Sequence, residues 1–398
     1  DPPCDAPAAG GVGTAAACGL PLYEHLLSVP FFIYPNLGQA ETLTVRGQVL
    51  DDRLFDRNHT GLRHLFPKKL SDDYYLIKAA YHHPMRTMDP AEAELFFVPT
   101  PMNEILDCMH RERIRGKICL AKSEICQLDL IHHLNAELGK SPWFQRSQGR
   151  DHLVIMSSFG WGDQGRKKDY FGANKPDNFL KCNKIIFEDR APYADYTSET
   201  LLRDEEPRSF NNNIEGHRIV LPNMYIGTGC PVVATKTSDF AMIAKHKPGN
   251  RKFLDRANIC EWLWNNSSSA TMNTGEEEGA QYDMPVCGSG IQCPALAEAK
   301  FGFHVQGDSF TANRLFDTLL SESVPIFTRR EQYELLPNWI DWEQVSYFVS
   351  VASRKAFFED LAKITSDEVL YQAKLAYIRR NNDLWDMENS PVALDMYL

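Results

Sequence analysis

The residues that say most about chemistry lie between Gly307 and Asp317. Gly307, Asp308 and Ser309 form a short polar loop after an apolar run and before a helical pattern, so a strand is expected to turn into a helix there. Ligands of open α/β sheets bind at this end of a strand, where the helix amino terminus offers free N–H groups and partial positive charge. Arg314 and Asp317 are spaced to share one helix face. This arrangement suits a diphosphate bound by Arg314, with the Asp317 carboxylate accepting hydrogen bonds from ribose hydroxyl groups.

A simpler interpretation fits the same residues. Arg314 and Asp317 could form an ion pair on the surface, and Gly-Asp-Ser could be an ordinary helix cap. Spacing alone favours this interpretation, because Gly-Asp-Ser is a common tripeptide.

Two patterns alternate along the chain, and together they predict the elements that position this loop. Short apolar runs predict buried strands at 31–35, 95–99, 151–156, 184–187, 218–222, 301–305 and 324–327. Amphipathic spacing predicts helices at 72–83, 123–139 and 311–321 and a mainly helical region at 353–384. Asp89, followed by proline and acidic residues, predicts a further helix start. Such alternation predicts an α/β protein with parallel sheets covered by helices.

A polar segment at 196–216 divides the chain into two α/β parts. We predict a tether at 1–19, an N-terminal domain at 20–210, a C-terminal domain at 211–352, and a helical segment at 353–398 that crosses back to the N-terminal domain. The 398 residues suffice for two such domains, because one domain usually takes roughly 100–200 residues.

Charge and hydropathy argue against two kinds of partner. The formal net charge is −11, whereas a general nucleic-acid binder usually has a basic face, so we expect no nucleic acid. No apolar run reaches the ~18–20 residues of a membrane span. The chain starts at Asp1 without an initiator methionine or signal peptide. We therefore expect membrane contact only through an anchor that this chain lacks.

Cysteines and glycosylation triplets favour the secretory pathway. The ten cysteines form no C-x-x-C pair, and Cys119/Cys126 and Cys287/Cys293 would each close a short loop if bridged. Acceptor triplets for N-glycosylation start at Asn58, Asn265 and Asn266. The sequence has no H-E-x-x-H helix and no Asp-x-Asp motif, so we expect no bound metal.

Four separated stretches resemble one protein family. The first, residues 83–99 (HPMRTMDPAEAELFFVP), is similar to the family pattern R-T-x-D-P-x-x-A-x-x-F-F-V-P. The others are residues 141–152 (SPWFQRSQGRDH), residues 303–327 with the Gly-Asp-Ser loop and Arg314, and residues 336–342 (LPNWIDW). In this order they resemble the exostosin-like glycosyltransferases of family 47.

The resemblance implies a GT-B fold, in which two Rossmann-like α/β domains face a cleft and C-terminal helices follow. It implies an inverting transfer of a sugar from a nucleotide diphosphate sugar, such as a UDP-sugar, without a catalytic metal or other cofactor. By position, Arg314 would contact the diphosphate and Asp317 the ribose. Gly307, Asp308 and Ser309 would lie beside the phosphates.

Inverting transfer also needs a general base to accept the proton of the acceptor hydroxyl. The family's His-Asp pair is replaced here by Phe159-Gly160, and Asp163 follows closely. Asp163, His82 and His83 are the catalytic candidates, although each histidine taken alone fits packing or exposure slightly better. A basic run at 245–256 supplies a further donor-binding candidate, Arg251, while part of the run fits a solvated face.

We therefore expect a hexosyl or pentosyl glycosyltransferase that acts on a glycan or glycoprotein in the Golgi lumen, as a type II membrane protein without its anchor, or after secretion. It could form homo- or hetero-oligomers. The alternative is a non-catalytic glycan-binding or scaffolding subunit, because the His-Asp pair is missing. An epimerase would need a G-x-G-x-x-G turn, which this sequence lacks.

Overall fold

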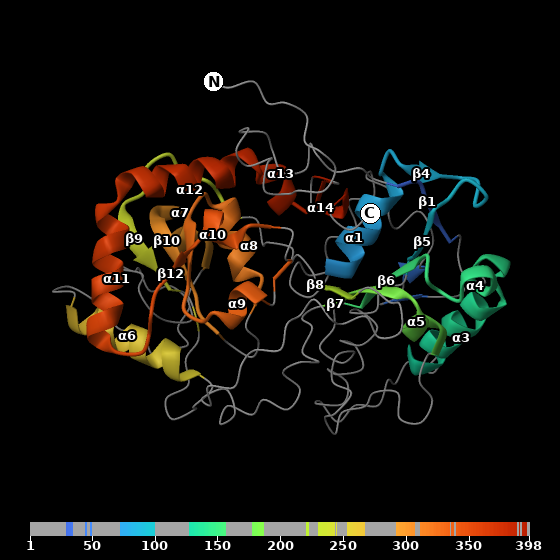
Figure 1. The fold of residues 1–398 in the computed structure, drawn as a ribbon, viewed down its shortest axis with the longest axis horizontal. Coiled ribbons are helices and arrows are strands. Elements are labelled where there is room, and N and C mark those ends of the chain that lie inside the picture. The colour runs from blue at the N-terminus through green and yellow to red at the C-terminus, as the bar shows by residue number, and fades with distance from the viewer. Residues whose placement is uncertain are drawn as a thin grey trace, which may run out of the picture. The chain divides into compact units, whose positions relative to one another are not determined.

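A computed structural model shows two units, each with its own sheet and core (Figure 1). It describes residues 29–34, 44–45, 48–49, 72–99, 127–156, 177–186, 220–222, 230–242, 244, 253–266, 292–306, 311–334, 336–337, 340–387, 390 and 392–395. The N-terminal unit comprises Leu27–Met224 together with Met387–Leu398, and the C-terminal unit includes Tyr225–Asp386.

The N-terminal unit is built on a parallel six-stranded sheet in the order β4-β1-β5-β6-β7-β8. Its strands are β1 (Phe31–Ile33), β4 (Arg86–Thr87), β5 (Leu95–Val98), β6 (His152–Met156), β7 (Asn183–Ile186) and β8 (Val220–Pro222). An antiparallel pair joins β2 (Thr44–Val45) to β3 (Gln48–Val49). The register aligns Phe32 with Phe96 and Phe96 with His152, so side chains from three strands share one face.

Aromatic contacts show what covers the two faces of this sheet. The Phe31 ring lies 5.4 Å from the ring of His83, which follows α1 (Asp72–Tyr81). On the other face, Phe96 stacks on Trp143 with ring centroids 5.7 Å apart. That face is covered by α3 (Gln127–Lys140) and α4 (Pro142–Ser147), and α5 (Asp177–Lys181) packs against α3 (Figure 1).

The C-terminal unit has a parallel four-stranded sheet in the order β12-β11-β10-β9. Its strands are β9 (Ser238–Ala241), β10 (Ala299–His304), β11 (Val324–Phe327) and β12 (Tyr347–Phe348). The central strand β10 carries the fully buried Phe303, and β11 carries the fully buried Phe327. Parallel strands that are buried on both faces usually have continuous apolar sequences. Strand β11 has such a sequence, and all of its residues are buried.

Helices surround this second sheet (Figure 1). They are α6 (Leu254–Asn266), α7 (Gln292–Glu298), α8 (Arg314–Leu320), α9 (Glu331–Glu334), α10 (Trp342–Val345), α11 (Arg354–Ser366), α12 (Glu368–Arg380) and α13 (Asn382–Trp385). Side-chain caps mark three of the starts, and Asp341 caps α10 by accepting from Glu343 N at 3.1 Å. The Ser353 hydroxyl accepts from Ala356 N at 3.2 Å, and the Asp367 carboxylate accepts from Leu370 N at 2.9 Å.

Gly302 allows α8 to lie close to β10. A Cβ atom at Gly302 would lie 2.6 Å from Cγ2 of Thr318, which is on α8. Side-chain carbon atoms do not approach this closely, so a larger residue would push the helix away from the strand. Because α8 carries both Arg314 and Asp317, the position of these residues depends on the glycine.

The last helix, α14 (Val392–Asp395), packs against α1 within the N-terminal unit. Contacts thus group Met387–Leu398 with the N-terminal residues, whereas α11, α12 and α13 belong to the C-terminal unit.

The predicted α/β class with parallel sheets and C-terminal helices is confirmed. One local prediction is wrong, because no helix starts at Asp89. Instead Asp89 closes a turn: its Oδ1 accepts from Ala91 N at 2.9 Å and its carbonyl accepts from Glu92 N at 3.1 Å. Strand β5 begins at Leu95, so too few residues separate the turn from the strand for a helix.

The sequence left the disulfide pairing open. Cys293 is bonded to Cys230 and therefore not to Cys287, and Cys119 and Cys126 lie outside the described residues. Cys230 and Cys293 meet because both pack in one apolar cluster with Ala241 and Leu296. Cys260 is disulfide-bonded as well, whereas Cys182 retains its thiol.

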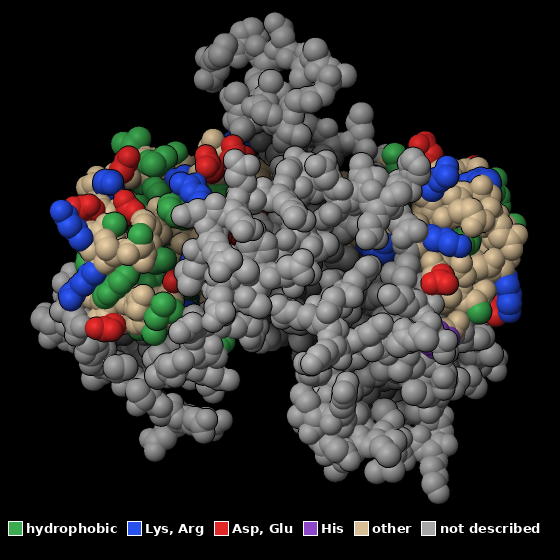
Figure 2. Space-filling model, turned by 60° about the horizontal axis from the view of Figure 1, so that its bottom comes forward, with side chains coloured by type: hydrophobic (Ala, Val, Ile, Leu, Met, Phe, Trp, Pro, Cys, Tyr) green, Lys and Arg blue, Asp and Glu red, His purple; other side chains and the backbone are tan. Residues whose placement is uncertain are grey.

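Charged side chains are interspersed on the described surface of the C-terminal unit, as Figure 2 shows for one face. Lys and Arg alternate with Asp and Glu there, which is the pattern of a solvated surface. None of the helices in the described ranges is both long and apolar enough to span a bilayer.

Candidate functional site

Arg314 is the first residue of α8 and lies at the carboxyl end of β10. The chain leaves β10 at His304, continues through Gln306, and enters α8 at Arg314. The guanidinium Nε and Nη1 atoms of Arg314 are shielded from solvent, and neither has a hydrogen-bond partner among the described residues. Buried guanidinium groups are normally paired or hydrogen-bonded, because an unmatched buried charge is costly. The arrangement therefore fits an anion bound at this end of the sheet.

A second guanidinium group, that of Arg256 on α6, lies at the same end. Arg256 is buried, and its Nε donates to the carbonyl of Gln306 at 2.9 Å. Its Nη2 is 3.5 Å from the carbonyl oxygen of Val305. These bonds attach Arg256 to Val305 and Gln306, the two residues that follow β10.

The electrostatics of Arg314 reflect both its burial and these neighbours. Burial, together with the positive charge of Arg256, lowers the pKa of Arg314 to about 10, and the carboxylate of Asp317 opposes this shift. A bound anion would offset both destabilising effects, because it would supply negative charge and hydrogen-bond acceptors.

Asp317 lies one turn along α8 and is fully buried. This burial excludes the interpretation of Arg314 and Asp317 as an ion pair on the surface. Thr311, just before α8, is also buried. The structure thus places Thr311, Arg314 and Asp317 around the start of one helix, with Arg256 at the same end of the sheet.

The sequence pointed to the basic run at 245–256 but favoured Arg251, which lies outside the described residues. Arg256 is the member of that run whose contacts the structure shows. The helical pattern around Cys260 and Trp262 could have indicated it, since Arg256 lies in the first turn of that helix and is buried there beside Asp255. Asp163, Gly307, Asp308 and Ser309 also lie outside the described residues.

His83 uses both of its ring nitrogens within the N-terminal unit. Nδ1 accepts from the backbone N–H of Met85 at 3.1 Å, so the neutral ring carries its proton on Nε2. Nε2 then donates to Asp395 Oδ1 at 2.7 Å, which attaches α14 to the loop after α1. To accept a proton from a substrate, His83 would have to lose one of these bonds. The neighbouring His82 is half-buried.

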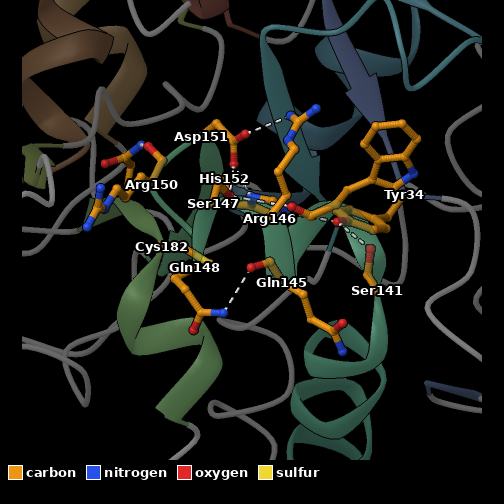
Figure 3. Close-up of polar contacts among 12 residues, drawn as sticks. Tyr34, Ser141, Gln145, Arg146, Ser147, Gln148, Arg150, Asp151, His152 and Cys182 are labelled. Atoms are coloured by element: carbon orange, nitrogen blue, oxygen red, sulfur yellow. Dashed lines mark hydrogen bonds and ion pairs between the residues drawn. The ribbon is translucent and has the colours of Figure 1, made fainter.

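A second polar cluster lies beneath α3 and α4 and centres on His152 (Figure 3). His152 Nδ1 is 2.6 Å from Asp151 Oδ1, and Nε2 is 2.7 Å from the hydroxyl of Tyr34. The Tyr34 hydroxyl is also 2.9 Å from Ser141 Oγ. A consistent set of donors has Nδ1–H donating to Asp151, Tyr34 donating to Nε2, and Ser141 donating to Tyr34.

This cluster supports the fold. Burial lowers the pKa of His152 and raises the pKa of Tyr34 to about 12, so both groups are neutral near pH 7. Burial opposes ionisation of Asp151 as well, but hydrogen bonds from Ser147 and Arg146 outweigh it and hold the pKa of that carboxyl below its ordinary value. Phe96 stacks on the His152 ring with centroids 5.0 Å apart. The enclosed ring of His152 thus helps to hold α4 against the sheet.

Within the described ranges, no group of three His, Cys, Asp or Glu side chains is arranged to hold a metal ion.

Comparison with known proteins gives a family match over most of the chain. The model of the Exostosin GT47 domain matches residues 47–361. The chain is 23% identical over 338 residues to "Probable xyloglucan galactosyltransferase GT17" of Arabidopsis thaliana, covering 80% of this chain and 67% of that protein. It is 19% identical over 318 residues to "Xyloglucan galactosyltransferase XLT2" of the same species, covering 74% of this chain and 54% of that protein. The match thus spans about two thirds of one relative and about half of the other.

Solved structures also match. A crystal structure of a GtfA/B complex is 11% identical, with 69% of this chain and 60% of that chain covered and a TM-score of 0.34. Arabidopsis thaliana UGT89C1 complexed with UDP is 9% identical, with 90% and 81% covered and a TM-score of 0.34.

Proposed function

Because the chain belongs to the exostosin GT47 family of glycosyltransferases, we propose that it transfers a sugar from a UDP-sugar to a hydroxyl group of a glycan or glycoprotein, with inversion at the anomeric carbon. The C-terminal unit would bind the donor, and the N-terminal unit would bind the acceptor. The donor sugar would be a hexose or a pentose.

The observation that carries this proposal is the buried guanidinium group of Arg314. Two of its nitrogen atoms have no hydrogen-bond partner within the described part of the chain, and Arg256 adds a second positive charge nearby. The negative charge of a diphosphate would complement the two guanidinium groups. Its oxygen atoms would accept pairs of hydrogen bonds from them. During transfer the same groups would stabilise the negative charge that develops on the leaving UDP.

We propose the remaining donor contacts from the sequence motif that precedes and begins α8. Gly307, Asp308 and Ser309 would place backbone N–H groups beside the phosphates, and Asp317 would accept hydrogen bonds from the ribose. Arg251 stays a candidate for a further phosphate contact.

A general base must accept the proton of the acceptor hydroxyl as that oxygen attacks the anomeric carbon. Asp163, His82 and His83 are the candidates. Because both ring nitrogens of His83 are already hydrogen-bonded, we place this role on Asp163 before either histidine.

Donor binding is proposed to need no metal ion, since two arginines supply the positive charge that a metal would supply. The disulfides fit an oxidising compartment, so we propose the Golgi lumen or the cell exterior as the site of action.

A transfer assay tests this proposal. The names of the two relatives make UDP-galactose and xyloglucan oligosaccharides the first pair to try, followed by other UDP-sugars and glycan acceptors. Proton NMR of the product would give the anomeric configuration, and we expect inversion in the presence of a chelator. A product that retains the donor configuration would contradict the mechanism. UDP binding without transfer to any acceptor would favour the non-catalytic role, which the replacement of the His-Asp pair by Phe159-Gly160 suggests.

A further inference from the structure

Gln332 joins the carboxyl ends of two neighbouring strands in the C-terminal unit. Its side-chain oxygen accepts from Thr328 N at 2.9 Å and from Arg329 N at 3.0 Å, just after β11. Its side-chain nitrogen donates to the carbonyl of His304, the last residue of β10, at 2.6 Å. Gln332 is fully buried, so all three bonds are protected from water.

Arg329 continues this set of contacts toward α6. Its Nε donates to Asp255 Oδ2 at 2.6 Å, and its Nη2 donates to Asp255 Oδ1 at 3.0 Å. Burial alone would lower the pKa of Arg329, but these two hydrogen bonds outweigh it and raise that pKa. Arg256 follows Asp255 in α6, and it donates to the backbone carbonyl of Gln306, just beyond the end of β10. We call Asp255, Arg256, Arg329 and Gln332 the carboxyl-end network.

Two of the charged groups in this network pair with each other. Arg329 engages both oxygens of Asp255 in a planar, two-point pair. The network therefore contains two guanidinium groups and one carboxylate. Arg256 donates to two backbone carbonyls, which hold its guanidinium group at the carboxyl end of β10.

We propose that Asp255, Arg329 and Gln332 are positioning residues for the diphosphate of the donor, and that they act by fixing the guanidinium group of Arg256 beside Arg314. This inference rests on the proposed function. It adds that phosphate affinity depends on a two-point ion pair that does not itself touch the phosphates. A lysine could keep the charge of Arg329 but could not make both hydrogen bonds in one plane.

The test compares Arg329→Lys and Asp255→Asn with the wild type, using UDP, inorganic pyrophosphate and uridine as ligands. Calorimetry would give the affinity for UDP and pyrophosphate, and ligand-observed NMR would give that for uridine. We expect each variant to bind UDP and pyrophosphate about tenfold more weakly, because a displaced binding group weakens contacts sharply. Uridine binding should be unchanged, since it involves no phosphate. The fold-loss of UDP affinity in the double variant should be smaller than the product of the two single fold-losses, because both changes break the same ion pair.

Arg330→Lys is the matched control. Arg330 is adjacent in sequence and exposed, and its Nη1 is 3.7 Å from Glu343 Oε1 in an exposed ion pair. This variant should keep the wild-type affinity for UDP. Gln332→Met is a further variant that removes these hydrogen bonds without adding a charge, and it should also weaken UDP more than uridine.

The outcomes separate this inference from the proposed function. If the folded wild type does not bind UDP, the proposed function fails and this inference fails with it. If the wild type binds UDP and Arg314→Met loses that binding, the donor site stands. Equal losses for UDP and uridine in Arg329→Lys and Asp255→Asn, or no loss for either, would then overturn the positioning role alone.

Discussion

The positive charge of Arg256 lowers the pKa of Arg314, so the guanidinium groups of these two residues influence each other at the carboxyl end of one parallel sheet. Like charges in a protein interior destabilise the fold unless other groups compensate. Arg256 is compensated by backbone carbonyls, whereas two nitrogens of Arg314 lack a partner among the described residues. A diphosphate would relieve this imbalance, which connects the stability of the unit to its proposed ligand.

The first prediction concerns the stability of the ligand-free protein. Arg314→Met should keep the thermal unfolding temperature of the wild type or raise it, because it removes an incompletely paired buried charge and fills a similar volume. Differential scanning calorimetry without nucleotide would measure this. A fall of several degrees would show that Arg314 supports the fold and would weaken its assignment as a ligand-binding residue.

Gly302 provides a prediction about the placement of α8. Gly302→Ala should lower the free energy of unfolding by about 1–3 kcal/mol, because the new Cβ would lie 2.6 Å from Cγ2 of Thr318. Urea denaturation would measure the loss. Thr318→Ser removes that methyl group, so the double variant should recover part of the stability, and absence of any recovery would contradict the proposed contact.

The buried ring of His152 predicts acid sensitivity. Burial lowers its pKa in the folded protein, whereas the unfolded chain titrates near about 6.5. Between the two pKa values the unfolded state binds more protons than the folded state. The stabilising contribution of the neutral His152 ring is therefore fully present above about pH 6.5, and it is lost as the pH falls from there toward the pKa of the folded state. Urea midpoints at pH 7.5 and pH 5.5 would show the effect. The difference should shrink in His152→Gln, and an unchanged difference would assign the acid sensitivity to other groups.

His83 and Asp395 predict a shared structural role. Loss of either partner breaks the bond that attaches α14 to the loop after α1, so His83→Gln and Asp395→Asn should lower the unfolding temperature by similar amounts. Both variants should retain glycosyl transfer at a temperature where they are folded. If only His83→Gln abolished transfer, His83 would be the general base and our placement of that role would be wrong.

Local sequence patterns predicted much of this molecule. Apolar runs identified the buried strands, and the motif around Arg314 and Asp317 located the strand-to-helix turn, because neighbours in sequence determine these features. The turn at Asp89 was mistaken for a helix start because the same cap residues serve both structures, and only the nearby start of β5 decides between them.

Contacts between distant residues were not predictable in the same way. Cys230 pairs with Cys293 across a separation of 63 residues, and Arg329 pairs with Asp255 across 74. Which member of the basic run at 245–256 contacts the strand end depends on how α6 packs against β10. Such packing is a property of the folded unit and leaves little local signal.

The most direct test of the central claim is calorimetric titration of UDP into wild type and Arg314→Met, with a chelator present and again with added divalent metal. Arg379→Met is the control, because Arg379 makes an exposed ion pair with Glu322. We expect the wild type and the control to bind UDP equally with or without metal. Arg314→Met should lose about 1.5–3 kcal/mol of binding free energy, the scale of hydrogen bonds to charged groups. Equal UDP affinity in wild type and folded Arg314→Met, or no binding by the wild type, would contradict the central claim.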